Sequence, residues 1–127
     1  MSVRIGEQTF EAEYMNTPEE KTKGMMGRRD LNGCMVFNMG KGHHSFWMKD
    51  CLIPLDIVFV LNNRINQIHQ NCPVEDSHRM TLPKYSGIGD HVIEFPAGTA
   101  NGWKTGDRVG MYLGSPINPV NQSYSRF

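Results

Sequence analysis

The chain has 127 residues, with 13 basic and 13 acidic side chains and a formal net charge of zero, and this length fits one domain that can bury a core without disulfides. The charge balance argues against a nucleic-acid-binding protein with a broad basic surface and against a polybasic membrane anchor, and no apolar run is long enough for a transmembrane helix. The chain has few Ala (3) and Leu (6) residues, 16 Val and Ile residues, and 36 Gly, Pro, Asn and Asp residues. This composition predicts a mainly β fold, either a compact β-sandwich or a barrel-like sheet.

The first predicted element is an N-terminal hairpin. Val3 and Ile5 alternate with polar neighbours, and the same alternation resumes over residues 10–14 after turn-forming residues 6–8. Alternation with a period of two is typical of a strand that buries one face. We therefore expect two antiparallel strands whose apolar side chains share a core.

One short helix follows the hairpin. Thr17 precedes Pro18 and stands three residues before Glu20, which is the pattern of a capping box with proline in the first turn. Gly27 is a suitable residue to end the helix. The sequence therefore predicts a helix over about residues 18–26.

The middle of the chain reads as strands separated by short turns. Residues 34–37 and 45–49 are predicted strands, and the glycine-containing segment 40–44 between them is predicted to be a turn. Residues 55–61 are almost wholly apolar, which indicates a central strand buried on both faces. The two asparagines at 62–63 predict a hairpin turn into the next strand.

The last third contains the longest predicted connection. Residues 71–90 lack a regular pattern, and long ordered loops are often functional. Strands are predicted over 91–95 and 108–113. We expect a single β-rich domain over residues 1–113, followed by an irregular tail over 114–127.

The cysteines bear on the compartment and on cofactors. Cys34, Cys51 and Cys72 are odd in number and widely spaced, and no secretory signal precedes them, which fits free thiols in a reducing environment. We expect a cytoplasmic protein that needs no cofactor, has no membrane or nucleic-acid partner, and has an oligomeric state that the sequence leaves open.

The segment 46–56 holds the densest set of polar and aromatic side chains. Trp47 and Lys49 share one face of the predicted strand, and Asp50 and Asp56 follow closely. A tryptophan, a lysine and two carboxyl groups could line a cleft that binds a small polar ligand, for example a carbohydrate. These residues, with Glu94 from a later strand, are the predicted ligand-binding set.

The same carboxyl groups have competing interpretations. Asp56 begins a buried strand, so it requires a partner such as Arg28 or Arg29, and a structural role is favoured. Glu94 either faces solvent or projects into a cleft near Asp56. In the second case Asp56, Glu94 and Lys49 are the candidates for acid–base catalysis in a hydrolase.

Metal binding and thiol catalysis are weaker alternatives. His69 and Cys72 form one loose pair, which His78 and Cys51 could complete, but no established zinc spacing is present and no metal site is predicted. Cys51 is the best-placed nucleophile if a histidine activates it, whereas a free cysteine is more often a small buried apolar residue.

Several segments together resemble one family. Residues 23–31 are similar to its Gly-Leu-Met-x-Arg-x-x-Leu motif, residues 34–37 to the following Gly-Met-Leu-Phe, and residues 46–59 to Phe-Trp-Met-Lys-Asn-Thr-x-Ile-Pro-Leu-Asp-Ile-Ile-Phe. Glu94 and the Gly-Asp-Arg-Val of 106–109 match the closing segments. The chain is identified on these residues as a member of the domain of unknown function 192 family, over about residues 10–113.

This resemblance implies a compact, mainly β domain with a short helix and supplies no established activity. Short stand-alone members occur in phages, so a phage origin is one expectation. Whether the protein is an enzyme stays open. The leading hypothesis is a small-ligand-binding domain, followed by a hydrolase with an Asp/Glu pair and by an interaction module anchored through Tyr124 and Phe127 of the tail.

Overall fold

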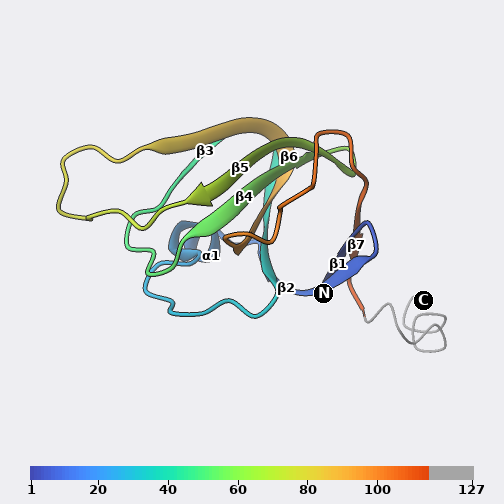
Figure 1. Cartoon of the computed structure of the whole chain (residues 1–127), viewed down its shortest axis with the longest axis horizontal. Helices are drawn as coiled ribbons and strands as arrows, with labels where there is room; N and C mark the ends of the chain where they lie inside the picture. Colours follow the sequence, from blue (N-terminus) through green and yellow to red (C-terminus); the bar gives the residue numbers. More distant parts are fainter. Residues whose placement is uncertain (115–127) are drawn as a thin grey trace.

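The computed structural model describes residues 1–114, which form seven strands and one short helix (Figure 1). The elements are β1 (Ser2–Ile5), β2 (Gln8–Met15), α1 (Pro18–Lys23), β3 (Cys34–Trp47), β4 (Leu55–Leu61), β5 (Arg64–Cys72), β6 (Lys84–Pro96) and β7 (Val109–Tyr112). All strands belong to one sheet in the order β5-β4-β6-β3-β2-β1-β7. The predicted mainly β fold with one short helix is confirmed. The expected tail beyond Gly114, with Tyr124 and Phe127, lies outside the described residues.

The sheet is mixed and curls into a half-barrel. β2 and β3 run parallel, whereas every other neighbouring pair is antiparallel. At one end the two outer strands meet, because an isolated bridge joins Arg64 of β5 to Arg108 just before β7. The backbone N–H of Val109 donates to the carbonyl of Asn63 at 2.9 Å, on the turn between β4 and β5. We call this meeting place the seam.

The helix begins as predicted and ends earlier. The side chain of Thr17 accepts a hydrogen bond from the N–H of Glu20, and the Glu20 carboxylate accepts one from the N–H of Thr17, which completes the capping box. The helix ends at Lys23 rather than near residue 26, because Gly24 adopts a positive φ of 44°. A Cβ on Gly24 would come within 3.1 Å of the Phe37 ring, so glycine lets the helix end pack on β3.

Two strands are longer than the sequence pattern indicates. The segment 40–44, predicted as a turn, lies inside β3, where the register with β6 shifts between Asn38 and Gly42. β6 begins at Lys84, although the sequence predicted a strand only from residue 91. A Cβ on Gly87 would come within 2.8 Å of the Phe59 ring, so this glycine permits close packing inside a strand rather than a turn.

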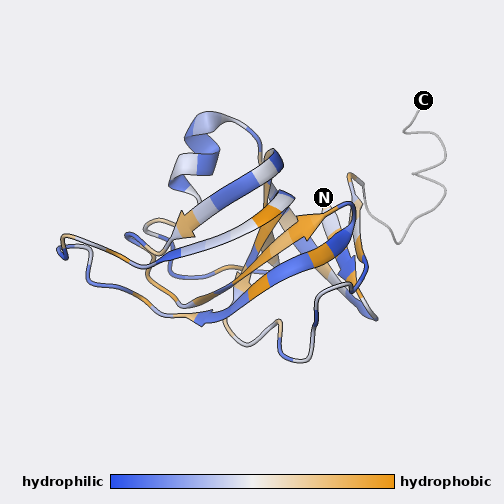
Figure 2. Ribbon diagram, turned by 90° about the horizontal axis from the view of Figure 1, so that it is seen from above, coloured by the Kyte–Doolittle hydropathy of each residue, from blue (hydrophilic) through white to orange (hydrophobic). Residues whose placement is uncertain are grey.

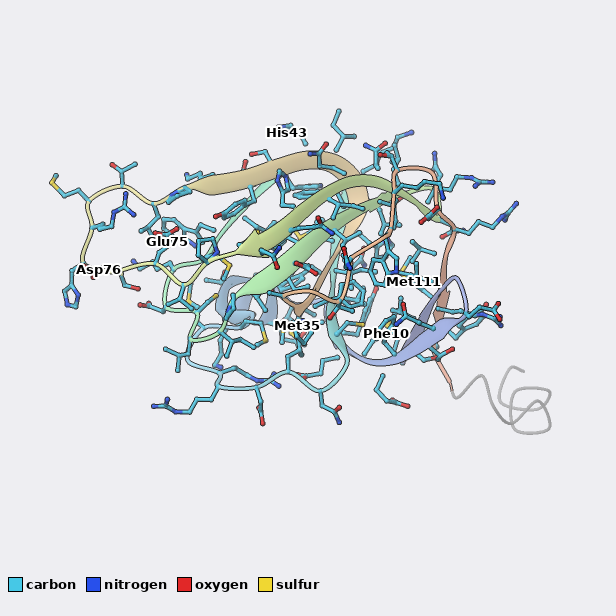
Figure 3. All side chains as sticks on the ribbon, in the orientation of Figure 1. Phe10, Met35, His43, Glu75, Asp76 and Met111 are labelled. Atoms are coloured by element: carbon cyan, nitrogen blue, oxygen red, sulfur yellow. The ribbon has the colours of Figure 1, made fainter. Side chains whose placement is uncertain are left out.

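The sheet is buried on both faces where β4 (55–60) pairs with the end of β6 (92–95) and next to the start of β3 (34–37), and two apolar clusters result. The inner cluster fills the concave side and includes Val36, Val58 and Ile93. The helix-side cluster includes Met35 and Phe37 and packs against Met25, just after α1. Figure 3 shows Met35 near α1, whereas Phe10 and Met111, which pack on the inner cluster, lie towards β1 and β7. Apolar residues concentrate in the strands, whereas α1 is polar (Figure 2).

Within residues 1–114 no helix has the length and apolar character needed to cross a membrane.

Candidate functional site

Glu94 is a buried carboxyl group on the helix-side face of β6. Its side chain is 3% exposed, and its cross-strand neighbours are Met35 and Ile57, both apolar. No group within residues 1–114 forms a hydrogen bond with its Oε1 atom, which is itself buried. Burial raises the pKa of this carboxyl group to about 8, so its neutral form predominates at pH 7. Glu94 does not face solvent, which corrects one of the two predicted orientations.

Glu94 contributes to the wall of a cleft of about 350 Å³ between α1, β3 and the segment after β3. We call this the α1 cleft. Its lining includes apolar side chains, the hydroxyl group of Thr22 and further polar side chains besides Glu94. The further polar side chains are those of Lys21, Lys23, Ser45 and Lys49, and the apolar ones include Met25, Phe37, Phe46, Trp47 and Cys51.

Lys21, Lys49 and Trp47 line the cleft, and Lys84 lies beside Trp47 without lining it. Trp47 is 41% exposed, and the ammonium groups of Lys49 and Lys84 lie 5.4 Å and 5.6 Å from the centre of its ring. Lys21 donates from Nζ to the carbonyl oxygen of Asn38 at 3.1 Å. Positive charges therefore stand near the opening, while an uncharged acid is buried in the wall.

Asp50, another predicted ligand-binding residue, lies in the turn after β3 and does not line the α1 cleft. Its backbone adopts a positive φ of 57°. Its N–H donates to Ser77 Oγ at 3.0 Å, and its carbonyl accepts from the N–H of Gly27 at 2.8 Å. The main chain of Asp50 thus connects three segments, and its exposed side chain takes no part in these contacts.

Asp56 lies on the inner face of β4 and is fully buried. Its Oδ1 atom accepts a hydrogen bond from the backbone N–H of Asn71, and its Oδ2 atom accepts one from the N–H of Ala100, both at 2.8 Å. Asp56 therefore fastens the end of β5 and the segment after β6 to β4. The expected partner Arg28 instead forms a bidentate pair with Glu13 at 2.6 Å and 2.7 Å. Backbone amides, not Arg28 or Arg29, satisfy Asp56.

Asp56 and Glu94 do not form an acid–base pair. In the register of β4 and β6, Asp56 lies opposite Phe95, and Glu94 lies opposite Ile57. Because successive side chains of a strand point to opposite faces, the two carboxyl groups are on opposite sides of the sheet. The structure therefore brings together Trp47, Lys49 and Glu94 of the predicted set and separates Asp56 from them. This corrects the proposed Asp/Glu pair and the predicted cleft shared by both acids.

Sequence reasoning missed Lys21, Lys23 and Ser45 as residues of the cleft. The lysines are visible in the sequence as the basic last turn of the helix. Which face of the helix meets the sheet depends on the packing of Met25 and on Gly24, so the sequence pattern could not assign these lysines to a site.

The cysteines are buried thiols. Burial raises the pKa of Cys51 to about 12, and the carboxylates of Glu94, once it is ionised, and of Asp50 act in the same direction. Burial likewise raises the pKa values of Cys34 and Cys72 to about 12. A nucleophilic cysteine is a thiolate, so this environment disfavours thiol catalysis at neutral pH.

The loose histidine and cysteine pair does not extend to a metal site in the described part of the chain. His69 Nε2 lies 2.8 Å from the carbonyl oxygen of Ser86, and Cys72 Sγ donates to the carbonyl of His69. His78 contacts Asp76 in the exposed loop between β5 and β6, which extends away from the sheet (Figure 3). Among residues 1–114 no cluster of three or more His, Cys, Asp or Glu side chains could hold a metal ion.

The sequence matches the model of a family described as DUF192, uncharacterized ACR, COG1430, over residues 1–111. A similar solved structure is a protein of unknown function from Novosphingobium aromaticivorans, with 32% identity, a TM-score of 0.75, and coverage of 87% of this chain and 84% of that one. Another is described as a putative transcription regulator from Sinorhizobium meliloti, with 27% identity, a TM-score of 0.75, and coverage of 86% and 91%. No curated protein matches the sequence.

Proposed function

The chain belongs to the DUF192 family, whose description names no activity, and we propose that it binds a small hydroxylated ligand with an acidic group, such as a sugar acid, in the α1 cleft. The observation that carries this proposal is the buried, unpartnered Oε1 atom of Glu94 in the cleft wall. A buried polar atom without a partner costs about 1–3 kcal/mol, which a ligand hydroxyl can recover. A neutral carboxyl group can both donate to a ligand oxygen and accept from a ligand hydroxyl.

The lysines support an acidic group on the same ligand. Lys49 and Lys84 place their ammonium groups over Trp47, so a neutral sugar that stacked on this ring would displace them without replacing their interaction. A carboxylate on the ligand would attract the same ammonium groups and leave the ring face for the sugar. The apolar lining between the lysines and Glu94 suits the C–H face of a sugar ring.

Tryptophan fluorescence offers a direct test. Trp103 packs on Phe95 in the inner cluster, at 5.0 Å between ring centres, so a Trp103→Phe variant keeps an aromatic ring there and leaves Trp47 as the sole tryptophan. We expect glucuronate to change the fluorescence of this variant in a saturable way and to raise its melting temperature, whereas glucose has a smaller effect.

Matched variants assign the effect to the cleft. Glu94→Leu and Lys49→Ala are each expected to weaken glucuronate binding about tenfold, which corresponds to one lost hydrogen bond or ion pair in a desolvated site. Leucine is the informative replacement, because a glutamine amide would keep both a donor and an acceptor. Lys41→Ala removes an exposed lysine of β3 that does not line the cleft, and it should leave binding unchanged. An absence of saturable binding for sugar acids, sugars and hydroxy acids at millimolar concentration would overturn the proposal.

A further inference from the structure

The seam contains a second hollow, of about 510 Å³, that shares no lining residue with the α1 cleft. Figure 1 shows β1 and β7 side by side on the part of the molecule away from α1. The residues around the hollow that matter here are Arg4, Gly6, Asn63, Arg108, Gly110 and Tyr112. The proposal made for the α1 cleft does not use any of them.

The strand register places three arginines on the outer face of the seam. Arg4 lies opposite Gly110 in the pairing of β1 with β7, and Arg64 lies opposite Arg108 in the isolated bridge. Val109, between Arg108 and Gly110, is buried in the inner cluster. Because side chains alternate along a strand, Arg108 shares the outer face with Gly110 and hence with Arg4.

These arginines are poorly neutralised. Arg4 donates from Nε to the carbonyl of Gly6 at 3.1 Å, and its only ion pair among residues 1–114 is a 3.9 Å contact with Glu7, whose side chain is 99% exposed. Arg64 donates to the carbonyl of Gly106 at 2.9 Å. Within residues 1–114 Arg108 forms no side-chain hydrogen bond or ion pair that meets ordinary distance limits.

Nearby carboxylates do not compensate for these charges. Asp107 accepts hydrogen bonds from the backbone N–H and the Nζ atom of Lys104, at 3.0 Å and 2.9 Å, and no Asp or Glu follows it in the sequence. Like charges directly opposite each other in a sheet are destabilising. Closure of the half-barrel therefore gathers guanidinium groups at a place where the neighbouring carboxylates are distant or bound to Lys104.

The hollow between them depends on a glycine. A Cβ on Gly110 would come within 2.8 Å of the Tyr112 hydroxyl oxygen, so a side chain at this position would displace the Tyr112 ring from its place over Gly110. The Tyr112 hydroxyl is a further hydrogen-bond donor beside the guanidinium groups. The hollow thus combines open space with hydrogen-bond donors and with guanidinium groups that have little counter-charge.

We propose that this seam hollow binds the phosphate group of a small phosphate monoester through Arg4, Arg108 and Tyr112. A tetrahedral oxyanion with two charges can accept hydrogen bonds from donors on several sides, whereas a carboxylate presents two oxygens in one plane. The guanidinium fork matches phosphate geometry and forms strong charge-assisted hydrogen bonds. Inorganic phosphate and a monoester share this chemistry, and the experiment separates them.

The test is calorimetric and thermal-shift titration of the full chain at low ionic strength, with inorganic phosphate, glycerol phosphate and acetate at matched ionic strength. We expect saturable binding of glycerol phosphate, weaker binding of inorganic phosphate and no saturable effect of acetate. Arg108→Gln should lower affinity for glycerol phosphate about tenfold, as for one lost charge-assisted interaction. Gly110→Ala should lower it as well, because the added Cβ would displace the Tyr112 hydroxyl group.

Two control variants make the result specific to the seam. Arg29→Gln removes an exposed arginine outside both hollows and should leave affinity within about twofold, because an isolated surface charge contributes little. Lys49→Ala should also have no effect, since Lys49 belongs to the α1 cleft. The proposal would be overturned if Arg29→Gln lowered the affinity for glycerol phosphate as much as Arg108→Gln, or if Lys49→Ala lowered it. It would also be overturned if acetate bound equally well, or if duplex DNA bound while glycerol phosphate did not. These outcomes are independent of whether glucuronate binds the α1 cleft.

Discussion

Asp56 and Glu94 are carboxyl side chains buried in neighbouring strands of one sheet, and they differ in what surrounds them. Both oxygens of Asp56 accept hydrogen bonds from backbone N–H groups of distant segments, at 2.8 Å each. Glu94 has an unpartnered oxygen, apolar cross-strand neighbours and a place in the wall of the α1 cleft. A satisfied buried acid maintains the fold, whereas an unsatisfied one beside a cleft is available to a ligand.

The contrast shows that burial alone does not tell whether the hydrogen-bonding capacity of an acid is used within the fold. The hydrogen-bond partners of the acid make the difference, and they come from elements remote in sequence. The N–H of Ala100, for example, donates a hydrogen bond to a carboxylate 44 residues earlier. Three variants test how far this difference between the two faces extends.

The largest expected effect concerns Glu94 and pH. Its pKa rises from an ordinary 4.5 in the unfolded chain to about 8 in the folded one, so between these pH values the folded state binds more protons. The free energy of unfolding must then fall as pH rises through this range, by at most about 5 kcal/mol for a shift of this size. Urea unfolding of the native protein between about pH 5 and pH 9 measures this loss.

Glu94→Gln is the control for this measurement, because glutamine keeps the shape and does not titrate. The native protein should lose stability relative to the variant as pH rises, and the difference should level off above the folded pKa. Parallel stability curves for both proteins would contradict a raised pKa and would remove the neutral acid from the proposed site.

Asp56→Asn should lower the free energy of unfolding by about 3 kcal/mol at pH 7, because the amide replaces one acceptor oxygen with an NH₂ group facing a backbone N–H. Urea unfolding measures the change. Asp50→Asn is a matched control, since it alters an exposed side chain and asparagine tolerates the positive φ at that position, so it should change stability by less than about 0.5 kcal/mol. Equal effects of both variants would show that Asp56 does not have the role assigned to it.

The smallest expected effect concerns the helix, and it tests whether the two faces of the sheet respond independently to a local change. Thr17→Ala removes the cap of α1 and should cost about 1 kcal/mol. Hydrogen exchange should become faster in α1, which borders the α1 cleft, while the N–H groups of Asn71 and Ala100 bound to Asp56 remain protected. Faster exchange at Asn71 and Ala100 to the same extent would indicate that the two faces are not separable.

Local patterns in the sequence predicted much of the fold. Three predicted features depend only on residues close together in the sequence, and each is present in the structure. They are the Thr17 capping box, the strand β4 with apolar residues on both faces, and the asparagine turn that follows β4. The lengths of β3 and β6 were not predictable in the same way. Gly87 resembles a turn residue in sequence, but its lack of a side chain admits the Phe59 ring from another strand.

The candidate site was only partly predictable. Trp47 and Lys49 are neighbours in sequence, so their proximity required no tertiary information. Asp56 was grouped with them because of the same proximity, and the register of β4 with β6 then separated it from Glu94. The lysines of α1 and the arginines of the seam could not be assigned, because each set is assembled by segments that meet only in the folded sheet.

The sequence by itself determined the class of the fold, the helix start and the apolar strands, because propensity, capping and alternation act between residues close along the chain. The tertiary structure alone decided which face each charge occupies. A strand exposes alternate residues to opposite sides, so the pairing register and the curl of the sheet place Glu94 beside a cleft, Asp56 among backbone amides and Arg108 opposite Arg64.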